Sequence, residues 1–422
     1  MTTCHQAEPG ISSPPTLRPT LEVGGIFQRH GDRYLANHRV SPMQAKVMRR
    51  LAACRTAKLG GHVDACRQCC TLRVSYNSCR DRHCPKCNAS KQAAWLEARL
   101  SRLLPVPYFH VVFTVPQQLN PLMLKNQRLL YNLLFRAASQ TLLELSRNPK
   151  RLGAQVGFTA VLHTWGQNLL FHPHLHCVVT GGGLSADGQS WVAARERYFL
   201  PVLVLGKLFR GKFLAEVKAL WQAGKLNLSG SVSELAGADA FNRLLSGLYR
   251  QSWVVYAKPP FAGAEHVFRY LGRYTHRVAI SNRRLLDLKD DRVLFRYKDY
   301  ADKNQWKSMS LEVDEFMRRF LMHVLPKGLV RIRHYGLLAA GNVNTKLARC
   351  MELLGVHGAS TIQSDPELDL THPEPESDCL TQPSDEPTGL ICPTCGCIMT
   401  RYPLETILAL RRRITPAVID SS

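Results

Sequence analysis

The chain has 422 residues, and hydrophobic residues make up 45% of it, which is enough to bury a large core and predicts two or three domains. Lys and Arg outnumber Asp and Glu by 55 to 32, and the resulting formal charge of +23 favours a polyanionic partner such as nucleic acid. The sequence shows no apolar run of eighteen residues and no leader pattern, so we expect an intracellular protein without a membrane span.

The N-terminal third begins with a Pro-, Ser- and Thr-rich stretch, and we predict that residues 1–33 are disordered. A helical pattern over residues 34–54 then opens a small zinc-binding, DNA-contacting domain, which we place at residues 34–104. Seven of the fourteen cysteines lie between Cys54 and Cys87. In a reducing compartment, such crowding predicts metal binding rather than disulfides.

The cysteine-rich segment has the spacing of a zinc ribbon. Two C-x2-C knuckles lie roughly fifteen residues apart, and each presents two thiolates from a tight turn. Eight side chains are candidate ligands for one or two structural zinc ions: Cys54, His62, Cys66, Cys69, Cys79, His83, Cys84 and Cys87. How these ligands pair stays open, Cys70 is expected to be a bystander, and reduced cysteines without metal are the alternative. Arg80 and Arg82 beside the knuckles are expected to contact DNA.

Residues 105–358 carry the pattern of a mixed helical and stranded domain. Strands are predicted over 108–115, 157–163 and 169–180, and helical patterns over 121–146, 208–221, 238–249, 264–276 and 311–325; residues 278–288 and 292–297 suit a hairpin, and 329–335 a basic strand. In the strand over 169–180, His172, His174 and His176 take alternate positions and therefore share one face. Converging imidazoles suit a divalent-metal or phosphate-handling site. The alternative is a half-buried strand whose polar positions happen to be His.

A pair of tyrosines follows about one hundred residues downstream. Tyr270 and Tyr274 lie one helical turn apart and can present two phenols together as nucleophiles towards phosphorus. Arg269, Arg273 and Arg277 would favour the deprotonated phenols and contact DNA. An aromatic pair packed in the core is the alternative.

The C-terminal part changes character. Residues 359–389 contain eight acidic side chains and no Lys or Arg, and we predict a linker there. In the remaining tail, residues 390–422, the segment 392–397 looks like half a zinc knuckle, which Cys350 or Cys379 could complete.

Taken together, these motifs resemble the HUH-type rolling-circle transposases with two tyrosines, and most closely the IS91-type insertion-sequence transposases with an N-terminal zinc-binding domain. The segments that carry the resemblance are 76–87, 172–176, 270–277 and 330–336. The resemblance implies an α+β fold, in which an antiparallel sheet holds the histidines on an inner strand, helices pack on one face, and a helix carrying the tyrosines lies across the sheet.

The resemblance also implies an activity, namely nicking and transfer of single-stranded DNA at the ends of the element through a 5′-phosphotyrosine intermediate. His174 and His176 would hold Mg²⁺ or Mn²⁺, with Gln167 as the expected third ligand and His163, His172 and His276 as competitors. No G-x4-G-K-[ST] motif is present, so no nucleotide cofactor is expected. The implied location is the bacterial cytoplasm, at the nucleoid.

Three other functions stay open at this point. A replication initiator or relaxase would use the same chemistry on another DNA site. A histidine-triad nucleotide hydrolase would use the histidine strand without metal, and a zinc-containing DNA-binding protein would use the charge and the cysteines without catalysis.

Overall fold

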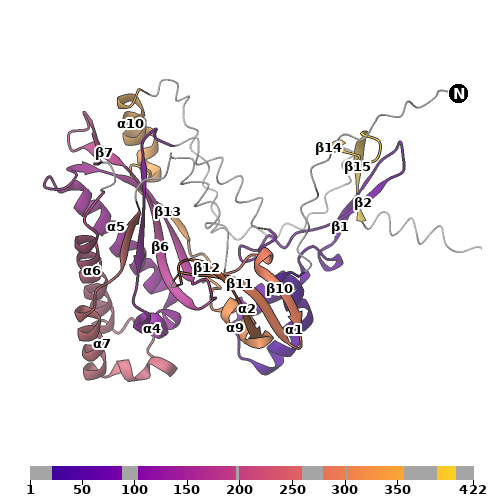
Figure 1. Cartoon of the computed structure of the whole chain (residues 1–422), viewed down its shortest axis with the longest axis horizontal. Helices are drawn as coiled ribbons and strands as arrows, with labels where there is room; N and C mark the ends of the chain where they lie inside the picture. Colours follow the sequence, from indigo (N-terminus) through magenta and orange to yellow (C-terminus); the bar gives the residue numbers. More distant parts are fainter. Residues whose placement is uncertain are drawn as a thin grey trace, which may run out of the picture.

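The computed structural model describes residues 21–87, 103–195, 199–258, 279–300, 302–355 and 387–404 (Figure 1). All strand pairs recorded among these residues are antiparallel and lie in four sheets, which confirms the predicted α+β class. No helix within the described ranges is long and apolar enough to cross a membrane.

The largest sheet has five strands, and it contains the histidine strand at its centre. In spatial order the strands are β13 (Ile332–Gly336), β5 (Gly157–Trp165), β6 (Phe171–Thr180), β3 (Tyr108–Thr114) and β9 (Val255–Lys258). The predicted strands over 108–115, 157–163 and 169–180 are therefore confirmed. Over residues 171–177 of β6, buried and partly exposed residues alternate, as a strand with one covered face requires, and the last three residues are all buried.

Helices cover one face of this central sheet (Figure 1). They are α4 (Asn120–Lys125), α5 (Gln127–Arg147), α6 (Val202–Gln222) and α7 (Ala238–Arg250). The rings of Phe113 on β3 and Phe209 on α6 meet edge to face with centroids 5.0 Å apart. From β6, Leu175 and Cys177 enter the same core and are fully buried. The side chains at the alternate positions of β6, which include the histidines, therefore point away from these helices.

A second compact body packs the N-terminal helices against a later part of the chain. It consists of α1 (Val23–Asn37), α2 (Pro42–Ala53), β10 (Leu285–Lys289), β11 (Arg292–Asp299), β12 (Gln305–Glu312) and α9 (Val313–Leu321). Phe27 of α1 and Phe320 of α9 make an edge-to-face contact with centroids 5.4 Å apart. Helix α1 begins inside the segment 1–33 that we predicted to be disordered, and the helical pattern over 34–54 spans the end of α1 and all of α2. Residues 1–20 lie outside the described ranges.

Strands β10 and β11 are joined by a two-residue turn of Asp290 and Asp291. Asp290 and Asp291 both have positive φ, at 49° and 54°. Positive φ at both central residues defines the two-residue turn whose twist matches that of a hairpin, and Asp tolerates this conformation better than most residues. The predicted hairpin is confirmed, although β10 starts only at Leu285 and a third strand, β12, extends the sheet.

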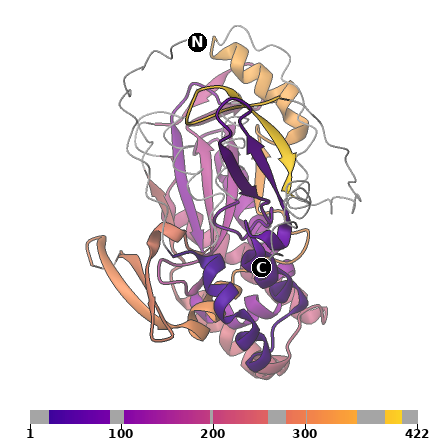
Figure 2. The same cartoon turned by 90° about the vertical axis from the view of Figure 1, so that its right-hand side faces the viewer.

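The third unit is a four-stranded ribbon built from both ends of the described chain. Its strands, in spatial order, are β14 (Pro387–Ile391), β15 (Ile398–Pro403), β1 (Gly61–Ala65) and β2 (Leu72–Tyr76). Figures 1 and 2 both show the yellow C-terminal strands beside the indigo N-terminal hairpin. The predicted linker over 359–389 thus ends inside strand β14, and the tail at 390–422 begins within a folded sheet.

A small sheet and a helix complete the described chain at one end of the central sheet. They are β4 (Ala154–Gln155), β7 (Gly182–Ser185), β8 (Trp191–Ala193) and α10 (Ala348–Leu353).

Candidate active site and zinc centres

Three imidazoles converge on the face of the central sheet that is turned away from α5 and α6. His174 and His176 come from β6, and His163 comes from β5. The two strands pair so that His163 lies opposite His174 and Val161 lies opposite His176, which puts all three histidines on one face. Their candidate ligand atoms all lie within 4.8 Å of one another.

Hydrogen bonds to the backbone fix the tautomer of His174. Its Nδ1–H donates to the carbonyl oxygen of His172 at 2.6 Å, so Nε2 carries a lone pair. This Nε2 lies 3.1 Å from Nε2 of His176. Two nitrogen lone pairs at that distance repel unless a proton or a cation lies between them. Neighbouring ligands of an octahedral ion with bonds of about 2.1 Å are about 3 Å apart, so the geometry fits a shared divalent cation.

A fourth imidazole orients His176. Nε2 of His110 lies 2.8 Å from Nδ1 of His176, and the two rings stack with an interplanar angle of 11°. When Nδ1–H of His176 donates to His110, the lone pair on Nε2 of His176 is directed towards Nε2 of His174. Such an outer hydrogen bond is the usual way in which proteins fix the orientation of a metal-binding histidine.

His174 and His176 are held in the neutral form that binds metal. Burial, followed by the charges of neighbouring His172 and His110, lowers the pKa of His174 to about 3. Burial also lowers the pKa of His176 well below its usual range, with contributions from His163, His174 and His110. Because a metal competes with protons for these nitrogens, neutral imidazoles at physiological pH favour metal binding.

The structure does not bring Gln167 to this set, and His163 takes the place that we expected Gln167 to fill. Strand β5 continues to Trp165, so Gln167 lies in the turn beyond it. There its side-chain Nε2 donates to the hydroxyl of Tyr300 at 3.1 Å, and its backbone carbonyl accepts a hydrogen bond from Arg284. His172 contributes its carbonyl oxygen to His174, and His276 lies outside the described residues.

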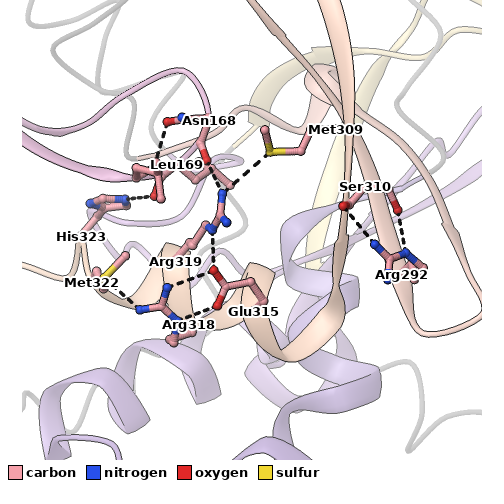
Figure 3. Close-up of polar contacts among 11 residues, drawn as sticks. Asn168, Leu169, Arg292, Met309, Ser310, Glu315, Arg318, Arg319, Met322 and His323 are labelled. Atoms are coloured by element: carbon pink, nitrogen blue, oxygen red, sulfur yellow. Dashed lines mark hydrogen bonds and ion pairs between the residues drawn. The ribbon is translucent and has the colours of Figure 1, made fainter.

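The turn between β5 and β6 is anchored from α9 and the residues after it (Figure 3). Arg319 donates to the carbonyl of Asn168 at 3.0 Å, and Nε2 of His323 donates to the carbonyl of Leu169 at 3.0 Å. Leu169 has a φ of 63° and is fully buried. Glu315 holds Arg319 in place and also binds Arg318; the bonds from Arg318, then those from Arg319, lower the pKa of Glu315 to about 2. These contacts fix the turn and thereby the register that sets His163 against His174.

Both candidate nucleophiles and their arginines lie outside the described residues. They are Tyr270, Tyr274, Arg269, Arg273 and Arg277, all within residues 259–278. Their assignment stays a prediction from the sequence.

Four buried cysteines form the first candidate zinc centre, which begins with the residue after α2. They are Cys54, Cys79, Cys84 and Cys87. Their Sγ atoms are 3.5 Å apart for Cys54 and Cys87, 3.5 Å for Cys54 and Cys84, and 3.7 Å for Cys79 and Cys87. Tetrahedral zinc with Zn–S bonds of about 2.3 Å separates its sulfurs by about 3.8 Å, so the four thiols fit one structural ion.

The remaining knuckle cysteines assemble differently from the ribbon that the spacing predicts. Cys66 and Cys69 lie with Cys392 and Cys395, so the knuckles at 66–69 and 84–87 do not share a site. Cys70 belongs to neither set. Of the two residues that we expected to complete the C-terminal half-knuckle, Cys350 is buried in a separate hydrophobic cluster. The other, Cys379, lies outside the described residues.

The two predicted histidine ligands lie apart from both cysteine sets. His62 points to Asp64, with Nε2 3.8 Å from Oδ2. His83 is buried; its Nδ1 bonds Oδ1 of Asp81 at 2.8 Å, and its Nε2 accepts the backbone N–H of Leu325 at 3.2 Å. Because both ring nitrogens of His83 are occupied, this residue ties the cysteine loop to the chain after α9 instead of binding zinc.

Of the two arginines expected to contact DNA from this loop, one has a structural role. Arg82 donates to the carbonyls of Pro326 and Leu329, both at 2.8 Å. Its guanidinium thus braces the loop against the segment that leads to β13. Arg80 is exposed.

Comparisons with known proteins agree with this geometry. Residues 157–346 match the family described as "Putative transposase", and residues 26–115 match the family described as "Transposase zinc-binding domain". The chain is 52% identical over 336 residues to "Putative transposase y4qJ" of Sinorhizobium fredii, covering 79% of this chain and 84% of the relative. It is 28% identical over 307 residues to the transposase for insertion sequence element IS801 of Pseudomonas savastanoi pv. phaseolicola, covering 70% of each chain. No solved structure matches the chain.

Proposed function

Because the chain belongs to the IS91-type transposases, a zinc-containing family whose known chemistry is rolling-circle transposition through a 5′-phosphotyrosine, we propose that it cleaves single-stranded DNA with a divalent ion held by His163, His174 and His176. Family membership sets aside the histidine-triad hydrolase and the non-catalytic DNA-binding protein. It also favours a transposase over a replication initiator or relaxase of the same chemistry.

The observation that carries this proposal is the convergence of three imidazoles on adjacent strands. His174 and His176 direct their Nε2 atoms towards one point, and His163 lies opposite His174 on the neighbouring strand. A divalent ion bound there supplies Lewis-acid polarisation of the scissile phosphate. The residues of the chain orient the site: His172 fixes the ring of His174 through its carbonyl, and His110 fixes the ring of His176.

The proposed nucleophiles are Tyr270 and Tyr274. The phenol of one tyrosine releases its proton to water, its Oη attacks the phosphorus, and the bond from phosphorus to the 3′ oxygen breaks. The leaving 3′ oxygen takes up a proton from water and becomes a hydroxyl. The products are a 5′-phosphotyrosine ester and a free 3′-OH. In the strand transfer that follows, the second tyrosine attacks another phosphodiester bond in the same way. Exposed Arg80, together with Arg269, Arg273 and Arg277, is proposed to bind the DNA phosphates.

The donor set favours Mn²⁺ over Mg²⁺. The three imidazoles offer only nitrogen ligands. Among the residues that the structure describes, no carboxylate joins this cluster. Mg²⁺ prefers oxygen ligands and gives up water reluctantly, whereas Mn²⁺ lies higher than Mg²⁺ in its affinity for nitrogen. We therefore expect cleavage at lower concentrations of Mn²⁺ than of Mg²⁺.

The test uses single-stranded oligonucleotides from the ends of the element, labelled at the 3′ end, with Mn²⁺ and denaturing electrophoresis. The proposal predicts a labelled protein–DNA adduct that is lost in the Tyr270→Phe, Tyr274→Phe double variant. The matched control is Tyr249→Phe, which changes an exposed tyrosine on α7 and should leave the adduct unchanged. An adduct that persists in the double variant, or that forms equally on duplex DNA of the same ends, would contradict the proposal.

A further inference from the structure

We propose that Cys66, Cys69, Cys392 and Cys395 bind a second structural zinc ion that joins the C-terminal segment to the N-terminal hairpin. The proposal is independent of the cleavage chemistry. Two of the four ligands lie outside both family matches, which end at residues 115 and 346.

The positions of the four sulfurs suit one tetrahedral ion. Sγ of Cys66 lies 3.3 Å from Sγ of Cys395, and Sγ of Cys69 lies 3.5 Å from Sγ of Cys392. All four sulfurs fall within 4.8 Å of one another. A disulfide would need a separation of about 2.05 Å, whereas tetrahedral zinc separates its sulfurs by about 3.8 Å, so the distances favour the ion.

The two pairs of ligands come from turns of the same construction. In the first, the backbone N–H of Cys66 donates to the carbonyl of Thr71, five residues on, at 2.9 Å. In the second, Cys392 donates to the carbonyl of Cys397, also five residues on, at 2.8 Å. The residue after each second ligand has positive φ, 57° at Cys70 and 73° at Gly396. Two equivalent knuckles facing each other are the arrangement of a zinc ribbon.

The strands around the site hold the two knuckles together. Strand β15 pairs with β1 over four residues, with Asp64 opposite Arg401. Nε of Arg401 donates to Oδ1 of Asp64 at 2.8 Å, and this carboxylate is almost fully buried. Beside the cysteines, the hydroxyl of Thr71 donates to that of Thr394 at 3.1 Å. Met399 is fully buried against Cys66 and Cys392, so the ion would close a small common core.

The site implies that residues 387–404 belong to the same structural unit as residues 61–76, more than three hundred positions away. Its exposure also differs from that of the first centre, since Cys395 is exposed and all four cysteines of the first centre are buried. We therefore expect the second ion to exchange faster and to be removed first by a chelator.

The first test is the zinc content of the full-length protein, purified under reducing conditions and measured by elemental analysis. We expect about two zinc ions per chain for the unchanged protein and about one for the Cys392→Ser, Cys395→Ser double variant. The matched controls are Cys70→Ser and Cys397→Ser, which change the two neighbouring exposed cysteines outside the set and should keep two ions. One zinc ion in the unchanged protein, or loss of an ion in the control variants, would overturn the proposal.

The second test asks whether the two ends of the chain share the ion. Alkylation followed by mass spectrometry should find Cys66 and Cys69 protected in the unchanged protein and labelled in the Cys392→Ser, Cys395→Ser variant. Protection of the first centre, for example at Cys84, should persist and shows that the variant is folded. If Cys66 and Cys69 stay protected in the variant, or if Cys84 is labelled along with them, the shared site is refuted.

Discussion

His323 is a buried imidazole that the candidate metal site does not use, and it shows how one residue can make the fold sensitive to pH. Its Nδ1 accepts from the hydroxyl of Thr164 at 3.2 Å, and its Nε2–H donates to the carbonyl of Leu169 at 3.0 Å. Only the neutral ring can make both bonds. Burial, with a smaller contribution from the charge of nearby His83, lowers the pKa of His323 to about 4, although the hydrogen bond to Leu169 opposes the shift.

This lowered pKa predicts a loss of stability in acid. The unfolded chain titrates at His323 near pH 6.5 and the folded chain near pH 4, so between these values the unfolded state binds more protons. The contribution of His323 to the free energy of unfolding is complete above pH 6.5 and is lost as the pH falls towards 4. The loss is at most about 3 kcal/mol. The free energy of unfolding, measured with denaturant at a series of pH values, should therefore depend less steeply on pH between 4 and 6.5 in His323→Gln than in the unchanged protein. The control His38→Gln, at a half-exposed histidine after α1, should keep the slope, and equal slopes for all three proteins would contradict the account.

At the scale of elements, the active-site strand is the part that the sequence predicts best. Its period of two is a local property, so His172, His174 and His176 could be placed on one face without knowing their neighbours. The sequence names His163 only as one of three competitors for the proposed third-ligand position. It could not single out His163, because His163 meets His174 only through the register between β5 and β6. That register depends on a turn held by Arg319 and His323 from a distant segment. A long-range pairing of this kind has no signal in the spacing of residues.

The edge strand β13 offers a test of how this sheet is closed. Gly336 ends β13 opposite Gly157, has a φ of 62°, and would place a Cβ atom 1.9 Å from the carbonyl oxygen of Val156. Gly336→Ala should therefore destabilise the protein by about 3 kcal/mol, since it adds backbone strain to a clash with rigid backbone. The measurement is the free energy of unfolding. The matched control is Gly341→Ala, where a Cβ meets nothing within 4 Å, and equal effects of the two substitutions would show that β13 is not packed as described.

For the whole molecule, the cysteines connect parts of the chain that are far apart in sequence. The first centre, Cys54, Cys79, Cys84 and Cys87, lies in the same hydrophobic cluster as Phe27 of α1 and Phe316 of α9. The sequence predicts zinc binding from the number and spacing of these residues, but it does not predict the partners, because ligand pairing depends on how β1, β2 and β15 associate. The same limit explains why His62 and His83 were expected as zinc ligands although their side chains pair with Asp64 and Asp81.

This arrangement predicts where removal of zinc will act. Stripping the first centre with a strong chelator should loosen α1, α2 and α9 together, because a structural zinc site supplies part of the folding free energy of its surroundings. Hydrogen exchange followed by mass spectrometry should show faster exchange in these three helices and little change in α5 and β6, whose core is a separate cluster. Uniform loss of protection, or none at all, would contradict this division of the molecule.

The central claim is that His163, His174 and His176 hold the catalytic ion, and Mn²⁺ binding tests it most directly. Electron paramagnetic resonance of the full-length protein, titrated with Mn²⁺, should show a bound ion whose affinity falls by about tenfold to a hundredfold or more in His163→Ala. Gln167→Ala should bind Mn²⁺ as the unchanged protein does, since its side chain turns to Tyr300. The same pattern is expected for the yield of the DNA adduct. Unchanged binding in His163→Ala, with a loss in Gln167→Ala, would contradict the account.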